Sequence, residues 1–170
     1  MLRIARRLDT LGAMELLTQL AVASGTAGAT ALMHLLGLAA CIEALHAGGG
    51  GRMIAPRARL HQALVVLLIG LGLFVLHALE IWLYAAVYLL LGEFDRLEDA
   101  LYFSTSTYST VGYGDVVMSH RWRVLGAIEG VNGIILLGWS TAFFVSLVRR
   151  LGALEEGWRL FRRPPPGAGG

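Results

Sequence analysis

Lysine is absent from this 170-residue chain, and cysteine occurs only once. A single Cys41 excludes an intrachain disulfide, and its apolar neighbours predict a buried structural thiol. The sequence also lacks a Cys/His cluster with metal-ligand spacing, a phosphate-binding glycine loop and a nucleophile elbow. Because no such constellation is visible, we expect neither an enzyme nor a cofactor.

Charged residues are also scarce. They make up 15% of the chain, hydrophobic residues make up 56%, and the mean hydropathy is +0.64. These values exclude an ordinary soluble domain and predict an integral, multi-pass membrane protein. The net charge of +2 is small, so we expect no nucleic-acid partner. All 14 basic residues are arginines, and the Leu-, Ala-, Gly- and Arg-rich composition is typical of a bacterial protein, so we expect the inner membrane.

Long apolar runs set the predicted organisation. Spanning a bilayer takes about 20 apolar residues, and residues 20–42, 63–91 and 124–148 all reach that length. Residues 97–109 are too short to span and suit a re-entrant helix, which the membrane tolerates only where protein or water surrounds it. We therefore predict an all-α membrane protein.

The N-terminal part, residues 1–47, allows more than one placement relative to the membrane. Its first 20 residues alternate arginine with leucine and isoleucine, as in an interfacial amphipathic helix, and an uncharged stretch follows. We favour a transmembrane helix here over a helix lying on the membrane or a signal peptide. A spanning helix places Arg3, Arg6 and Arg7 outside, against the positive-inside rule.

Stretches rich in glycine, proline and arginine mark the remaining segment boundaries. Residues 48–61 form a basic linker without an acid, which predicts a cytoplasmic loop. Residues 62–150 form the main domain, and residues 151–170 form a short, disordered tail. Contact with anionic lipid and simple topological anchoring fit the basic residues of this tail equally well. The basic residues are Arg159, Arg162 and Arg163 of the tail, together with Arg149 and Arg150 at the end of the preceding helix.

The sequence Thr-Val-Gly-Tyr-Gly at residues 110–114 is the most specific motif. Gly112 and Gly114 lack a Cβ and reach backbone angles closed to other residues. Successive carbonyls can then point toward one axis, and four such loops make rings that replace the hydration shell of K⁺. The alternative is a glycine-rich turn that matches the motif by chance.

The flanking residues favour the first interpretation. The run Ala100-Leu101-Tyr102-Phe103-Ser104 precedes the motif, and Asp115 follows it. Residues 77–146 thereby resemble the two-helix pore domain of prokaryotic potassium channels. The resemblance implies an outer helix (62–91), a pore helix (97–109), a selectivity filter (110–114), an inner helix (122–150) and a homotetramer. It also implies K⁺ as the permeant ion, held by the carbonyls of Thr110, Val111, Gly112, Tyr113 and Gly114.

The resemblance also implies which residues support the filter. Tyr102 and Phe103 would form an aromatic cuff against which Tyr113 packs, with Thr107 beside the filter. Some family members carry a glutamate where this chain has Ser106, so a carboxyl pair with Asp115 cannot form here. Tyr108 replaces a small residue, so the packing behind the filter must differ.

Polar residues within the spans are candidates for gating or coupling. His77 and Glu80 share one helix face and form either a pH-sensing pair or a hydrogen-bonded strut; we favour the strut. Glu129 lines the cavity or faces the helix of Glu80, and we favour the latter. Asn132 is the better cavity candidate, and Gly133 aligns with the family's inner-helix hinge. We expect His34 to be a packing or interface residue rather than a ligand.

Conduction would be passive and K⁺-selective. The alternatives are a weakly selective cation channel and a non-conducting subunit that modulates a partner channel. No arginine ladder at every third residue is present, so we expect no voltage sensor. About twenty residues follow the inner helix, which predicts no ligand-binding regulatory domain.

Overall fold

The chain folds into helices joined by short loops. The computed structural model describes residues 2–47 and 56–150, and in these ranges it contains helices and no strand. The helices are α1 (Leu2–Ala47), α2 (Pro56–Leu90), α3 (Leu97–Tyr108) and α4 (Arg123–Arg150). The expected all-α class is confirmed.

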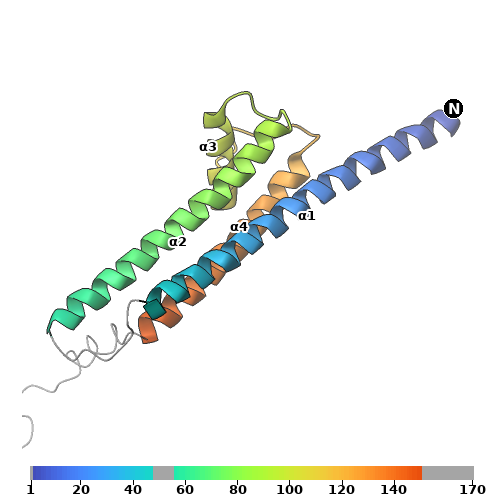
Figure 1. Cartoon of the computed structure of the whole chain (residues 1–170). Coiled ribbons are helices and arrows are strands. Elements are labelled where there is room, and N and C mark those ends of the chain that lie inside the picture. The colour runs from blue at the N-terminus through green and yellow to red at the C-terminus, as the bar shows by residue number, and fades with distance from the viewer. Residues whose placement is uncertain (1, 48–55, 151–170) are drawn as a thin grey trace, which may run out of the picture.

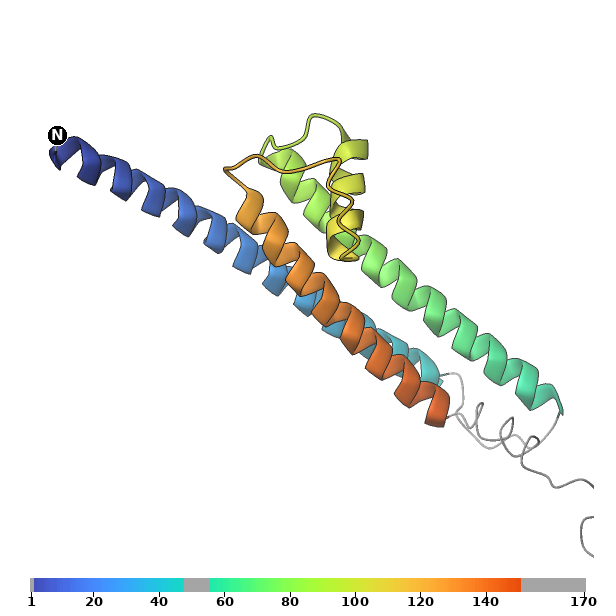
Figure 2. The same ribbon diagram turned by 180° about the vertical axis from the view of Figure 1, so that it is seen from behind.

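Three long helices lie side by side, and the short α3 lies near one end of them (Figure 1). Helices α1 and α4 run in the same direction, and α2 runs in the opposite direction. Seen from behind, α1 extends well beyond the others at its N-terminal end (Figure 2). Both α1 and α3 pack on α2 and on α4.

The three long helices have the length and composition of membrane spans. The apolar segments are Gly12–His46, Gln62–Leu90 and Arg123–Arg149. They agree with the three runs expected from hydropathy and support an integral membrane protein. Helix α1 runs in the same direction as α4, and α4 begins near α3. If all three long helices cross the membrane, the N-terminus and α3 therefore lie on the same side.

Two boundaries differ from the sequence-based expectation. Helix α1 is continuous from Leu2 to Ala47, where we expected an interfacial segment followed by a span. Helix α2 begins at Pro56, inside the range 48–61 that we expected to be a linker. Proline suits a first helical position because its missing N–H has no partner there in any helix. The rest of that linker, 48–55, and the expected tail, 151–170, lie outside the described residues.

A glycine ends α2 and directs the chain toward α3. Gly92 has φ +67°, and its N–H donates to the Leu89 carbonyl at 3.0 Å. The N–H of Glu93 donates to the Tyr88 carbonyl at 3.0 Å. This pair of bonds is a Schellman motif, which satisfies the last carbonyls of a helix.

The core lies where α2, α3 and α4 meet. Its largest side chains belong to Tyr84, Tyr88, Tyr108 and Leu125, and α1 contributes Ala23. A smaller cluster, formed by Ile69, Leu73 and Leu147, joins α2 and α4 toward the other end. The core therefore fixes α3, and the loop that follows it, against two long helices.

Candidate functional site

Residues 110–114, which we call the glycine loop, have an alternating backbone. Thr110, Gly112 and Gly114 have φ values of +62°, +55° and +78°, whereas Val111 and Tyr113 between them have negative φ. A backbone whose φ alternates in sign can turn successive carbonyls to the same side, and the glycines at 112 and 114 permit the positive values. The carbonyls of this loop can therefore line one surface.

Thr110 stores backbone strain. A β-branched residue with positive φ is an outlier, and such a conformation costs about 1–3 kcal/mol. The Thr110 N–H donates to the Thr107 carbonyl at 3.0 Å, so the turn out of α3 holds this residue in place. Strain of this kind persists where the surroundings enforce it, which is common at functional sites.

Ser106 fastens the middle of the glycine loop. Its carbonyl accepts from the Gly112 N–H at 3.1 Å, and its hydroxyl oxygen accepts from the Tyr113 N–H at 3.3 Å. The sequence singled out Ser106 as the place where a supporting carboxyl is missing. Ser106 instead supports the loop through its own backbone and hydroxyl oxygens.

Tyr102 supports the end of the loop. Its hydroxyl donates to an Asp115 carboxylate oxygen at 2.7 Å. Its ring stacks on Tyr113, with the centroids 6.4 Å apart and the planes 15° from parallel. The hydrogen bond from Tyr102 lowers the pKa of Asp115 below the ordinary value of an aspartate. Tyr113 itself is 72% exposed.

We expect Tyr102→Phe to raise the pKa of Asp115 toward its ordinary value. Because the folded-state pKa is lowered, the stabilisation is present above the unfolded pKa and is lost as pH falls through the folded pKa. Titration of the Asp115 carboxyl carbon by NMR, in wild type and variant, measures the change. Equal midpoints would contradict a direct hydrogen bond.

Phe103 does not share this position with Tyr102. Its ring lies 5.5 Å from Tyr88 and 5.4 Å from Phe94, measured between centroids. The resemblance implied that both aromatic residues form a cuff around the loop. In this chain Tyr102 lies against Tyr113, and Phe103 packs toward α2, because consecutive residues of a helix point about 100° apart.

A buried carboxyl joins the three helices around the loop. Glu129 on α4 is fully buried and accepts hydrogen bonds from the hydroxyls of Tyr88 on α2 and Ser104 on α3. The Ser104 hydroxyl also lies 3.0 Å from the Ile81 carbonyl. Glu129 therefore faces the helix of Glu80, which was the orientation favoured from the sequence.

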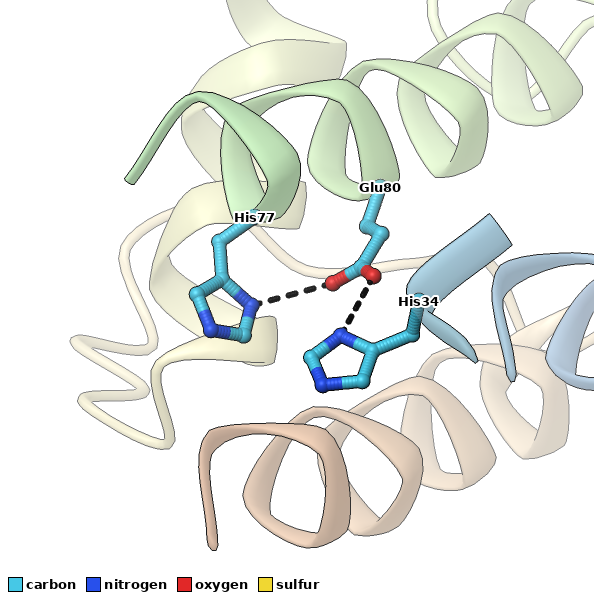
Figure 3. Close-up of side chains that lie close together, drawn as sticks. All are labelled: His34, His77 and Glu80. Atoms are coloured by element: carbon cyan, nitrogen blue, oxygen red, sulfur yellow. Dashed lines mark hydrogen bonds and ion pairs between the residues drawn. The ribbon is translucent and has the colours of Figure 1, made fainter. Parts of the chain in front are cut away.

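A second buried network surrounds Glu80. Figure 3 shows Glu80 between His34 of α1 and His77 of α2, with one carboxylate oxygen toward each imidazole. The distances to Nδ1 are 2.8 Å for His34 and 3.0 Å for His77. Tyr108, the last residue of α3, donates its hydroxyl to the same carboxylate. His77 and Glu80 thus connect to α3, and the choice between a strut and a pH-sensing pair stays a prediction.

Ser140 completes this network from α4. Its hydroxyl oxygen lies 2.9 Å from Nε2 of His77 and 3.4 Å from Nε2 of His34. We call the five residues His34, His77, Glu80, Tyr108 and Ser140 the histidine cluster. All four helices contribute to it, and its Tyr108 lies two residues before the glycine loop along the chain.

Asn132 points toward α1 and α2, and not into the cavity that the sequence had suggested. Its amide donates to Thr30 of α1 at 2.8 Å and to Tyr84 of α2 at 3.2 Å. We expected Asn132 to line a cavity. It packs instead toward α1 and α2, because α1 supplies a hydroxyl at the depth of Asn132.

Gly133 lies against the backbone of α3. A Cβ at Gly133 would lie 2.2 Å from the Tyr108 carbonyl oxygen, and one at Gly130 would lie 3.4 Å from the Thr107 carbonyl oxygen. The contact at Gly133 requires glycine for the close approach of α4 to α3, whereas the contact at Gly130 is near ordinary van der Waals distance. We expected Gly133 as a hinge; in this structure its lack of a side chain allows helix packing.

The sequence alone did not single out α1 as a partner of the site. The helix carries a stripe of small and polar buried residues at helical spacing, namely Gln19, Ala23, Thr26, Thr30 and His34. Such a stripe within an apolar helix indicates a protein-facing side. Reading this stripe would have predicted that α1 packs on other helices.

Comparison with known proteins identifies one segment. Residues 76–150 match the family model described as ion channel. This segment is similar to ion channels. It contains the end of α2, all of α3, the glycine loop and α4. Neither a curated protein nor a solved structure matches the chain. Together with three helices suited to spanning a membrane, the match supports an ion channel.

Proposed function

We propose that four copies of this chain form a K⁺-selective channel, with one glycine loop from each copy around a central axis. The alternating φ signs of residues 110–114 are the observation that carries this proposal. Four loops of this kind would present rings of carbonyl oxygens, which replace the water around K⁺. Conduction would be passive, down the electrochemical gradient, and would need no cofactor.

The exposed apolar residues support assembly with further copies. Val111 is 53% exposed and Val131 on α4 is 61% exposed. Val117, Ile134 and Tyr113 are also exposed in the single chain. Neighbouring copies would cover these side chains in a closed, four-fold ring, since closed symmetry is the rule for homo-oligomers. Lipid would surround the outer faces, with anionic lipid at the basic tail.

The proposed topology follows from α3 and the arginines. The glycine loop lies near the outer side of a bacterial inner membrane, and the basic segment 48–61 lies in the cytoplasm. Helix α1 then crosses the membrane and places the N-terminus outside. The contacts of α1 with α2 and α4 support this arrangement.

Rubidium uptake into liposomes tests the proposed function. We expect uptake with wild-type protein that excess sodium does not suppress, and loss of uptake in Gly112→Ala. Alanine at φ +55° costs about 1–2 kcal/mol of backbone strain and turns a carbonyl away. Gly138→Ala is the matched control, because a Cβ there meets nothing within 4 Å.

The outcomes separate the alternatives. Equal uptake of sodium and rubidium would replace the proposal by a weakly selective cation channel. No uptake by the purified protein alone would favour a subunit that modulates a partner channel. Unchanged uptake in Gly112→Ala would remove the glycine loop from the ion pathway.

A further inference from the structure

The histidine cluster contains more ligand atoms than a strut requires. His34, His77 and Glu80 each offer one atom, and these atoms all lie within 4.8 Å of one another. Two imidazoles and one carboxylate are a donor set that suits first-row transition metals such as Zn²⁺. Figure 3 shows both rings turned toward the carboxylate between them.

The spacing of the donors is close to that of a coordination shell. Ligands of a tetrahedral ion with bonds of 2.0–2.1 Å lie about 3.3 Å apart. The Glu80 oxygens lie 2.8 Å and 3.0 Å from the two Nδ1 atoms. The Tyr108 hydroxyl lies 3.0 Å from Nδ1 of His77 and contacts the same Glu80 oxygen. Phenol, imidazole and carboxylate thus form a triangle, with the second imidazole beside it.

Hydrogen bonding leaves the neutral cluster incomplete in one arrangement of its protons. If each Nδ1 carries the proton that it donates to Glu80, both Nε2 atoms are acceptors. Both of them face the single hydroxyl of Ser140, at 2.9 Å and 3.4 Å. One hydroxyl proton cannot serve two acceptors, so in this arrangement one imidazole nitrogen lacks a donor. An unmet buried polar group of this kind costs about 1–3 kcal/mol.

A metal ion removes this mismatch. When both Nδ1 atoms bind the ion, each imidazole carries its proton on Nε2. The Ser140 oxygen has two lone pairs and can accept from both rings. Ligating histidines in proteins almost always donate their other ring N–H to such an oxygen, which fixes the ring orientation.

We propose that the histidine cluster binds one divalent transition-metal ion, such as Zn²⁺, through Nδ1 of His34, Nδ1 of His77 and the Glu80 carboxylate, with the Tyr108 oxygen as the fourth ligand. The ion would join α1, α2 and α3, and its ligand Tyr108 lies two residues before the glycine loop. Ser140 of α4 would orient both imidazoles.

Charge balance supports Tyr108 as the fourth ligand. A divalent ion with one carboxylate and two neutral imidazoles retains one positive charge, which is unfavourable in a dry interior. Loss of the Tyr108 proton to solvent on binding would make the cluster neutral, and a bound cation promotes that loss. His34 and Glu80 are fully buried, whereas the His77 side chain is 14% exposed. His77 therefore marks the side from which an ion would enter.

Metal content of the purified protein tests this inference independently of ion conduction. The full chain in detergent is stripped with a chelator and titrated with Zn²⁺ or Co²⁺. Bound ion is measured by mass spectrometry, and Co²⁺ is measured by its visible absorption. We expect about one ion per chain in wild type, loss of that ion in His34→Ala and Glu80→Gln, and about 10–100-fold weaker binding in Ser140→Ala.

Two matched variants serve as controls. His46→Ala removes an exposed histidine from the same helix, and Glu129→Gln removes a buried carboxylate that has other partners. Both should keep one ion per chain. Absence of a bound ion in wild type, or equal binding in His34→Ala, would overturn the proposal. An additional proton on one imidazole would then complete the cluster. Rubidium uptake does not enter this measurement, so failure of either proposal leaves the other testable.

Discussion

Replacing Gly133 by alanine is expected to unfold the contact between α4 and α3. The new Cβ would lie 2.2 Å from the carbonyl oxygen, 2.9 Å from the carbonyl carbon and 3.0 Å from the Cα of Tyr108. All three are backbone atoms, and the Tyr108 side chain is fastened to Glu80, so α3 cannot withdraw without breaking that bond. Overpacking a core costs about 1–3 kcal/mol and sometimes more; we expect about 3 kcal/mol or more here.

Thermal unfolding of the purified protein in detergent measures this loss. Gly138→Ala is the control on the same helix, because its Cβ meets nothing within 4 Å and alanine favours helix over glycine by about 1 kcal/mol. We expect a large fall in melting temperature for Gly133→Ala and none for Gly138→Ala. Similar melting temperatures would contradict the close approach of α4 to α3. Rubidium uptake should fall with Gly133→Ala, because Tyr108 lies two residues before Thr110.

Glu129→Ala is expected to have the second largest effect. Glu129 is fully buried and accepts from both Tyr88 and Ser104. Its removal leaves the Tyr88 hydroxyl without an acceptor, at about 1–3 kcal/mol, and opens a cavity that adds to the loss. Ser104 keeps the Ile81 carbonyl as a partner. We expect about 3 kcal/mol in total.

Two comparisons isolate the cause of this loss. Glu129→Gln preserves the shape and one acceptor, so a smaller fall in melting temperature is expected. Glu98→Ala removes an exposed carboxylate of α3 whose ion pair with Arg96 is also exposed, and such pairs contribute little. An equal effect of Glu98→Ala and Glu129→Ala would show that burial of Glu129 does not stabilise the fold.

The helices and the glycine loop could be predicted because their signals are local. Apolar length sets the spans, and the two glycines of the loop mark positive φ, which the structure has at Gly112 and Gly114. Thr110 at φ +62° could not be predicted, because no local rule places a β-branched residue there. The surrounding packing imposes that conformation.

The surroundings of the buried polar residues could not be predicted for a different reason. A single histidine on an apolar helix does not reveal its partner, and His34 lies 46 positions from Glu80. Asn132 was expected in a cavity because α1 had no assigned position beside α4. Long-range pairing depends on which faces of the helices are in contact. Hydropathy predicts the length of a membrane-spanning helix, but not how the helix is rotated about its own axis.

The polar stripe of α1 has a consequence for how the protein is made. Helix α1 is synthesised before α2 and α4. The partner of His34, Glu80, is synthesised 46 residues later, and the partner of Thr30, Asn132, is synthesised 102 residues later. Until then its polar side chains would face lipid or the insertion machinery. Its polar side chains therefore favour packing of α1 against α2 and α4 over contact with lipid. A chain stopped after α1 should be a substrate for membrane quality control.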